Sequence, residues 1–368
     1  MKLLQIIILL FISIGAFAQK VTYNYMVDSS DVEAKAVMTL FESYLASNPE
    51  NQESNPYWNA EEQEKHKNYD FLESEFHPSL YMGFPVHVLS IKFINDICQI
   101  KAQFSYCKED GSPYVLAIAN YIAKKENGKY KLYNSLSYNK QNWNSTTVGL
   151  VTFFYPLYHK FDNEKAEKLN DFIIETCNNF DVQPKKFEYY LADDFDEIQN
   201  LKGLDYYLGM GGQSKPSGKA TDDKVYCGGL GEYYAHEVYH VQIDEHFPNN
   251  HLWVSEGVAT LLGGSRGKSL TWHINRTNLY LQKHPEIDLN NMLRLSNLDS
   301  ETSFHYVLGG LIAKKIFDKG GWSLLKEFMS SGKTDEDYYN AIDEYLGVNR
   351  LEINKYIREQ LQIEANKY

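Results

Sequence analysis

The chain is poor in cysteine, and its four cysteines stand where disulfide bonds are not expected. Four cysteines in 368 residues do not make a disulfide scaffold, and none has the C-x-x-C spacing of redox and zinc motifs. Cys98 and Cys107 lie an odd number of residues apart in one extended run, so they face opposite sides of a regular strand. Cys177 and Cys227 pair only if the fold brings them together. We expect free, buried thiols.

Positive charge is also scarce. The formal net charge is −13, which argues against nucleic acid or an anionic membrane surface as the main partner. The sequence contains no internal repeat and no low-complexity tract. Hydrophobic residues make up 43% of the chain, enough for sizeable cores, and its length allows two domains of about 150 residues each.

The one long apolar run lies at the N-terminus. Met1-Lys2-Leu3 precedes an apolar stretch that reaches Phe17, and Ala16-Phe17-Ala18 fits the small-x-small cleavage rule. The stretch is interrupted by Gln5 and is shorter than the roughly 20 apolar residues that a membrane-spanning helix needs. No cysteine follows it for a lipid anchor. We therefore expect residues 1–18 to be a signal peptide and the protein to be exported, periplasmic or secreted, without a membrane span.

Residues 19–146 are predicted to form an N-terminal α+β domain. Helical spacing covers 31–46, and a polar stretch with a charge run follows it. Asp110-Gly111 and Asn127-Gly128 are hairpin turns between extended runs. The predicted strands are 86–94, 99–106, 114–124 and 130–138. A helix followed by a curved antiparallel sheet resembles, in topology alone, the cone-like fold of the nuclear-transport-factor and cystatin-like superfamilies.

Residues 147–368 are predicted to form a second domain, with a small mixed sheet followed by helices. Its polar segment 203–223 is rich in glycine, serine and lysine and is interpreted as a mobile loop. Strands are expected at 148–155, 187–191 and 224–227, and helices at 163–179, 194–201, 270–282, 304–317, 322–329, 336–345 and 351–364.

A turn of glycines at 228–231 leads into one H-E-x-x-H motif, a pattern typical of zinc sites. His236 and His240 stand four residues apart, so on a helix both imidazoles point to the same place. Glu237 lies about 100° further round the helix, beside the metal, where its carboxylate can take a proton from a zinc-bound water. The second helical stretch, Trp253 to Thr260, supplies Glu256, the third protein ligand that a His₂Glu zinc site needs.

These two motifs together resemble the gluzincins, in particular their aminopeptidase-like branch and small peptidase MA-like relatives, whose second helix begins W-x-x-E-G-x-A-[ST]. The resemblance covers roughly residues 148–330 and implies a gluzincin-like catalytic domain. It implies one Zn²⁺ per chain, bound by His236, His240 and Glu256, with Glu237 as general base. A residue beyond the second helix would stabilise the oxyanion. Tyr306 is the first candidate, with His305 behind it, although Tyr306 can equally be a packing aromatic among 29 tyrosines.

The chain departs from that family in two ways. The gap between His240 and Glu256 is 15 residues, shorter than in the classical aminopeptidases. The G-x-M-E-N motif that grips a free N-terminus in those enzymes is absent, and Gly209-Met210-Gly211-Gly212 only echoes it. Both differences favour an endopeptidase or an unusual substrate over an aminopeptidase.

Two other motifs compete with this interpretation. His246 stands at the third-histidine place of the metzincin pattern, but the glycine that this pattern needs for its turn is Ile243 here. We therefore expect Glu256, and not His246, to be the ligand. Residues 263–269 resemble a phosphate-binding P-loop, but their glycine spacing is one residue short and they follow a helix. Glycine there is expected to end the Glu256 helix.

Two functions remain in view. The first is a secreted zinc-dependent metallopeptidase that hydrolyses a peptide or protein substrate by Glu237-assisted attack of zinc-bound water. The second is a non-catalytic envelope binding protein that retains the zinc-peptidase scaffold and recognises its partner with the tyrosine-rich N-terminal domain. The intact Glu237 favours the enzyme, because a purely structural zinc site has no use for it.

Overall fold

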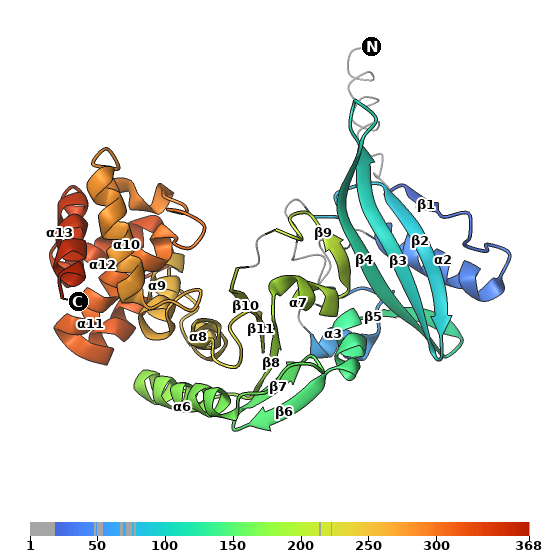
Figure 1. Cartoon of the computed structure of the whole chain (residues 1–368), viewed down its shortest axis with the longest axis horizontal. Helices are drawn as coiled ribbons and strands as arrows, with labels where there is room; N and C mark the ends of the chain where they lie inside the picture. Colours follow the sequence, from blue (N-terminus) through green and yellow to red (C-terminus); the bar gives the residue numbers. More distant parts are fainter. Residues whose placement is uncertain are drawn as a thin grey trace, which may run out of the picture. The chain divides into compact units, whose positions relative to one another are not determined.

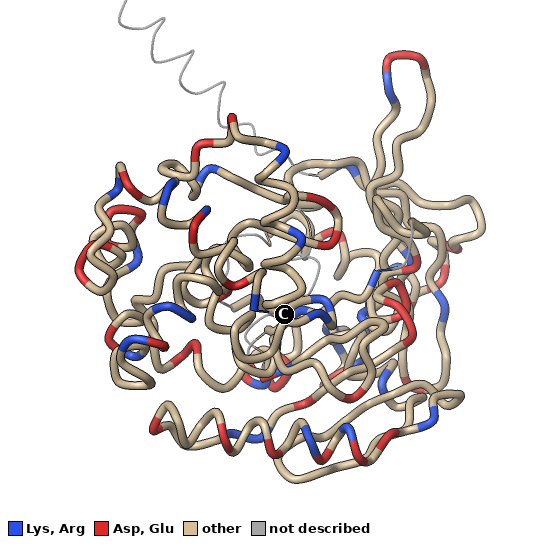
Figure 2. The backbone as a smooth tube through the Cα atoms, turned by 60° about the vertical axis from the view of Figure 1, so that its left-hand side comes forward, with Lys and Arg blue, Asp and Glu red and all other residues tan. Residues whose placement is uncertain are grey.

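The structure is a computed structural model that describes residues 19–47, 49, 54–66, 69–70, 76, 79–212, 215–221 and 223–367. It divides into two compact units, Met1–Asn142 with Gln199–Gly212 and Trp143–Ile198 with Gln213–Tyr368. The expected signal peptide lies outside the described residues. No helix in the described ranges is long and apolar enough to cross a membrane. Figure 2 shows basic residues dispersed along the chain among the acidic ones, which outnumber them by 49 to 36.

The first unit is a curved sheet with a helix, as predicted (Figure 1). Its sheet runs in the order β1-β2-β3-β4-β5, and β9 pairs with β4. The pairs from β2 to β5 are antiparallel, but β1 is parallel to β2, so the sheet is mixed and not wholly antiparallel as expected. The elements are β1 (Val21–Tyr23), α2 (Val32–Leu45), α3 (Ala60–Lys65), β2 (Val86–Ile94), β3 (Ile97–Cys107), β4 (Pro113–Glu126), β5 (Lys129–Tyr133), α5 (Ser135–Asn139), η2 (Lys140–Asn142) and β9 (Leu204–Tyr207).

Helix α2 begins where Asp31 caps it, because the Asp31 side chain accepts a hydrogen bond from the backbone N–H of Ala34 at 2.7 Å. Its buried face packs with strand residues in a single core. The strand expected to reach residue 138 ends at Tyr133. Asn134 interrupts it, since its side chain accepts from the N–H of Leu136 and starts α5.

The second unit opens with a five-stranded sheet in the order β10-β11-β8-β7-β6. Strands β7, β8 and β11 are parallel to one another, while β6 and β10 pair antiparallel at the two edges. Helices α6 and α8 bury apolar residues against it. Its elements are β6 (Asn144–Val148), β7 (Val151–Tyr155), α6 (Asn163–Phe180), β8 (Phe187–Ala192), α7 (Phe195–Leu201), β10 (Ser217–Thr221), β11 (Lys224–Gly228) and α8 (Ala235–Ile243).

Two predictions for this region were wrong in part. The strand expected over 148–155 is the hairpin β6–β7, which turns at Gly149 with a φ of 56°. The segment 203–223, expected to be a loop, contributes β9 to one sheet and β10 to the other. Its composition is typical of a loop, but its residues form backbone hydrogen bonds with strands β4 and β11, and this pairing makes them strands.

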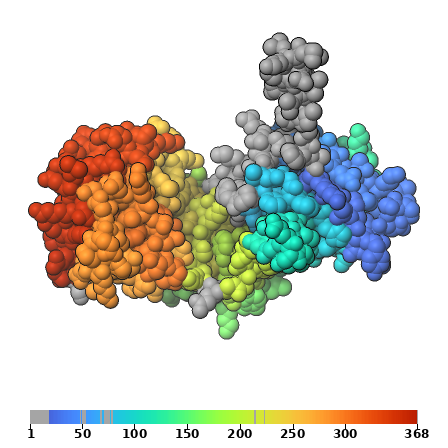
Figure 3. All heavy atoms as spheres, turned by 90° about the horizontal axis from the view of Figure 1, so that it is seen from above, coloured from blue at the N-terminus to red at the C-terminus, as the bar shows by residue number. Residues whose placement is uncertain are grey.

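The rest of the chain is helical, as expected, and packs around one apolar core (orange to red in Figure 3). Helix α11 is interrupted at Gly321, where φ is 61°, between the two helices predicted there. The elements are η3 (Asp244–His246), α9 (Leu252–Gly263), α10 (Leu270–Lys283), η4 (Leu289–Arg294), α11 (Phe304–Met329), α12 (Asp335–Leu346) and α13 (Ile353–Ala365). All four cysteines are free, but Cys107 is exposed, so the expectation of buried thiols was wrong for this residue.

Candidate metal centre

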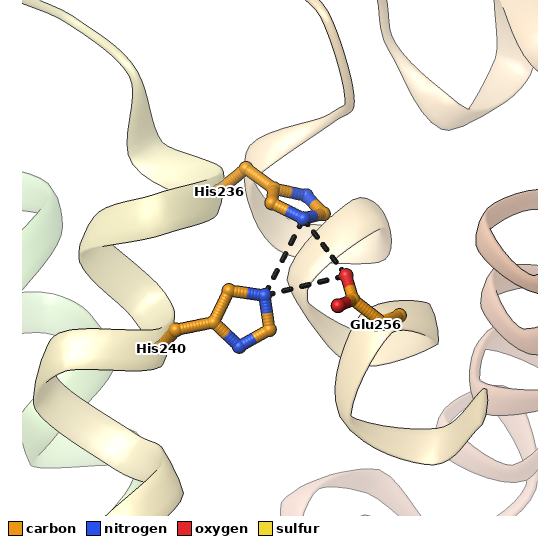
Figure 4. Close-up of side chains that lie close together, drawn as sticks. All are labelled: His236, His240 and Glu256. Carbon is orange, nitrogen blue, oxygen red and sulfur yellow. Dashed lines mark hydrogen bonds and ion pairs between the residues drawn. The ribbon is translucent and has the colours of Figure 1, made fainter. Parts of the chain in front are cut away.

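Helix α8 carries the H-E-x-x-H motif directly after a glycine turn. Gly229 and Gly231 adopt φ values of 78° and 69°, which glycine reaches without strain. His236 and His240 then stand one helical turn apart, and their rings point toward Glu256 on the neighbouring helix α9 (Figure 4). His236 is almost fully buried, whereas His240 and Glu256 are partly accessible.

Glycines let the three helices around this site pack backbone against backbone. A Cβ atom on Gly257 would lie 2.4 Å from the carbonyl carbon of Gly309, and one on Gly263 would lie 2.5 Å from the backbone nitrogen of His236. Both distances are too short for any side chain. Gly257 follows Glu256 directly, so the E-G pair of the second motif combines a ligand with the close approach of α11 that supports it.

The three donor atoms lie at the mutual distances that one small cation requires. Nε2 of His240 is 3.4 Å from Nε2 of His236 and 3.4 Å from Oε2 of Glu256, and Nε2 of His236 is 3.1 Å from the same oxygen. Tetrahedral zinc with bonds of about 2.0–2.1 Å separates its ligand atoms by about 3.3 Å. His236, His240 and Glu256 are the only such group of histidine, cysteine and acidic donors in the described part of the chain.

Hydrogen bonding of the histidines also fits a cation. Nδ1 of His236 lies 2.7 Å from the carbonyl oxygen of Gly264, which can only accept, so this nitrogen carries the proton. The other ring nitrogen, Nε2, then faces a carboxylate oxygen of Glu256 at 3.1 Å. A divalent metal bound there would take a nitrogen lone pair from each imidazole and an oxygen from the carboxylate.

A second layer of contacts orients the ligands. Nδ1 of His240 lies 2.9 Å from Oδ2 of Asp244, and the Ser255 hydroxyl donates to Oδ1 of the same carboxylate at 2.9 Å. Burial lowers the pKa of His240, but the hydrogen bonds with Asp244 and Glu256 outweigh burial and raise it well above its ordinary value. For Glu256, burial raises the pKa, and the contacts with both imidazoles hold it far below its usual range. The site therefore keeps Glu256 ionised and ready to bind a cation.

Glu237 projects from the same helix toward the edge strand β10. Its Oε2 accepts a hydrogen bond from the backbone N–H of Ala220 at 2.7 Å. Gly218 makes room for this arrangement, because a Cβ atom there would lie 2.9 Å from Cγ of Glu237 and 2.2 Å from the ring of Tyr234. Glu237 is half-buried and is not one of the three grouped donors, as the helical geometry predicted.

Tyr306 lies in the first turn of α11, beside the candidate metal ligands. Its ring stands edge-on to that of His236, with centroids 5.4 Å apart, and no hydrogen bond joins its hydroxyl to another described residue. Burial, followed by the nearby charges of Glu256 and Glu237, raises its pKa, so the phenol stays protonated and able to donate. His305 stands next to it, and its Nδ1 lies 2.6 Å from the Ser303 hydroxyl.

Neither the metzincin-like histidine nor the P-loop-like segment supplies a donor to the metal centre in the described part of the chain. His246 lies on η3, where Nε2 is 3.6 Å from Oε1 of Glu245, outside the group of donors. The P-loop-like segment 263–269 ends α9 and begins α10, as expected. Gly264 adopts φ 73° and ψ −166°, a conformation open essentially to glycine alone, and this aims its carbonyl at His236.

Sequence reasoning missed the supporting contacts of Asp244, Gly264 and Ala220. Asp244 carried a usable signal, because it stands four residues after His240 and so on the same helical face. The carbonyl of Gly264 and the N–H of Ala220 have no such signal, since backbone groups of distant segments contact the site only after folding.

No protein-family model matches the chain, and no curated protein matches it in sequence. The structure resembles that of an M1 zinc metallopeptidase from Deinococcus radiodurans, with 11% identity and a TM-score of 0.31, over 76% of this chain and 62% of that one. It also resembles a two-domain M1 zinc metallopeptidase variant bound to L-arginine, with 9% identity and a TM-score of 0.28 over the same shares. The chain thus spans less than two thirds of these solved chains. With scores this low, the chemistry of the site has to be inferred from its own residues.

Proposed function

We propose that the protein is an exported zinc-dependent metallopeptidase that hydrolyses peptide bonds. The observation that carries the proposal is the convergence of His236, His240 and Glu256 at zinc-ligand distances, with both imidazoles oriented by further hydrogen bonds. Export rests on the N-terminal sequence pattern alone. A zinc ion bound there would polarise a substrate carbonyl and lower the pKa of water to about 7.

Glu237 is the proton carrier in this proposal. Its position next to His236 in the sequence places the carboxylate beside the ligands, and the N–H of Ala220 holds one oxygen. The other oxygen is free to take a proton from the attacking water and to deliver it to the leaving amine, as general acid–base catalysis requires.

Tyr306 supplies the hydrogen bond to the developing oxyanion. Its raised pKa keeps the hydroxyl protonated through the neutral range, and that hydroxyl has no other partner among the described residues. A donor that has no partner in the resting site can form its strongest hydrogen bond with the charge that develops in the transition state. Such preferential bonding lowers the activation barrier.

Strand β10 supports a peptide as the substrate. It is an edge strand of its sheet within the described chain, and the N–H of its residue Ala220 reaches Glu237. An extended peptide can add to such an edge by backbone hydrogen bonds, which would bring it beside the base.

The test is to purify the protein, measure its metal content and assay a mixed peptide library before and after chelation. We expect one zinc per chain and cleavage that is lost on chelation and restored by zinc. Full zinc occupancy without cleavage of any peptide would contradict the enzyme and favour the binding protein.

A further inference from the structure

The turn that follows α9 places an arginine in a conformation that arginine rarely adopts. Ser265 and Lys268 exchange two backbone hydrogen bonds of 2.9 Å across it. The two residues between them, Arg266 and Gly267, have φ values of 51° and 72°. Tight turns with two positive φ values favour asparagine, aspartate and glycine, because a longer side chain is strained there. An arginine at this position is therefore a candidate for a role beyond forming the turn.

Contacts with the metal centre hold this turn in place. The carbonyl of Gly264 accepts from Nδ1 of His236 at 2.7 Å, and the carbonyl of Ser265 lies 3.1 Å from Nε2 of the buried His273. The backbone N–H of Arg266 itself donates to the Tyr234 hydroxyl at 3.4 Å. The backbone of Arg266 is therefore fixed relative to the metal ligands.

The Arg266 side chain is half-buried at this turn. Gly264, Gly267 and Lys268 line a cavity of about 870 Å³, and Arg266 is not among the residues that line it. The positive charge of Arg266 also acts on Tyr306, where it lowers the pKa of the phenol against the larger effect of burial. The charge of the guanidinium thus reaches the residue that we assign to the oxyanion.

Arg266 has no acidic partner among the described residues, although the chain has 49 acidic side chains for 36 basic ones. Arg276, one helix further on, shows the usual outcome, since its guanidinium lies 2.6 Å from a carboxylate oxygen of Asp299. A guanidinium presents a planar set of donors that matches a carboxylate. Left unpaired beside a catalytic centre, it is suited to a carboxylate that arrives with the substrate.

We propose that Arg266 binds a substrate carboxylate close to the scissile bond, so that the enzyme selects peptides that are acidic or end at that point. The effect on substrate selection rests on the proposed peptidase function, whereas carboxylate binding by Arg266 does not. The carboxylate has two sources, the C-terminus of a short peptide and an aspartate or glutamate side chain, and both offer the same group to the guanidinium.

The experiment compares matched peptides on the full-length protein. One pair differs only in a free or amidated C-terminus, and a second, amidated pair has Glu or Gln next to the cleaved bond. The variant is Arg266→Asn, because asparagine tolerates a positive φ and keeps the turn. Lys268→Gln on the exposed side of the same turn is the control. Thermal unfolding shows that each variant is folded.

We expect Arg266→Asn to lower kcat/KM about 10- to 100-fold for the carboxylate member of one pair and less than about threefold for its neutral partner. The pair that responds identifies the source of the carboxylate. Lys268→Gln should leave both pairs unchanged. An equal loss for both members of each pair, or no loss, would overturn the inference.

Binding separates this inference from the proposed function. In a Glu237→Gln background, the affinity for the same peptides is measured by calorimetry with and without Arg266→Asn. If the wild-type protein cleaves no peptide but Arg266→Asn weakens binding of the carboxylate member alone, the peptidase function is refuted and the carboxylate-binding role of Arg266 is supported. If the wild-type protein cleaves peptides but Arg266→Asn leaves the affinities for both members of each pair unchanged, the role of Arg266 is refuted and the peptidase function is supported.

Discussion

Oδ2 of Asp244 lies 2.9 Å from Nδ1 of His240, while the other oxygen of the carboxylate accepts from Ser255 at the same distance. One carboxylate therefore joins the end of α8 to the helix that carries Glu256. A carboxylate behind a metal-binding histidine fixes the ring and makes its free nitrogen a stronger donor to the metal.

Removing this support should weaken zinc binding without abolishing it. For Asp244→Asn we expect a loss of zinc affinity of about 10- to 100-fold, measured by competition with a chromogenic chelator. The control is Glu245→Gln at the next position, where the carboxylate pairs with Lys185 at 2.8 Å. Unchanged affinity in Asp244→Asn would show that the contact does not serve the metal.

The close contact between α9 and α11 should not tolerate a methyl group. A Cβ atom on Gly309 would lie 2.2 Å from the carbonyl oxygen of Trp253, so Gly309→Ala must push the helices apart. We expect the free energy of unfolding to fall by about 1–3 kcal/mol, measured by urea denaturation. Gly212→Ala is the control, since the nearest atom to its Cβ would be the carbonyl oxygen of Gly209 at 3.4 Å, an ordinary contact. Equal stability of Gly309→Ala and the wild type would refute the packing described.

The core of the first unit contains a buried carboxylate among tyrosines. Asp70 accepts from the hydroxyls of Tyr44 and Tyr81, and the Tyr81 hydroxyl lies 2.9 Å from that of Tyr121. Asp70→Ala leaves two buried hydroxyls without their acceptor, each at a cost of about 1–3 kcal/mol. We expect unit 1 to unfold at a clearly lower temperature in calorimetry. The exposed Asp110→Ala should change little, and a matching loss there would argue against this cluster as the cause.

Cys107 should react with thiol reagents much faster than the three buried cysteines. Burial raises the pKa of Cys98 to about 12, and that of Cys177 to about 11. It raises the pKa of Cys227 to about 12 as well. At pH 8 these thiols stay protonated, with less than about one thiolate in a thousand, and thiolate is the reactive form. We expect a disulfide reagent to label only Cys107 rapidly in the native protein and all four after denaturation.

The Cys107→Ser variant should lose the rapid phase completely. A second rapid thiol in the native protein would show that a buried cysteine is more accessible than its environment indicates.

The sequence predicted best those elements whose stability is local. Helix α10 was expected over 270–282 and spans Leu270–Lys283, because one apolar stripe and its Ser269 cap suffice to define it. The three candidate metal ligands were likewise predicted from helical spacing and from the family resemblance, and the structure brings their donor atoms together. Strands β9 and β10 could not be predicted from the sequence, since their stability comes from partner strands elsewhere in the chain. Arg266 was hidden for the same reason, because a P-loop-like string of letters does not reveal a turn held by His236 and His273.

The most direct test of the central claim is the hydrolysis rate of a cleaved peptide by Glu237→Gln, with zinc content measured in the same samples. We predict one zinc per chain in both proteins, because Glu237 is not a ligand, and a rate at least about 100-fold lower in the variant. A variant that retains zinc and cleaves within a few-fold of the wild-type rate would contradict the account.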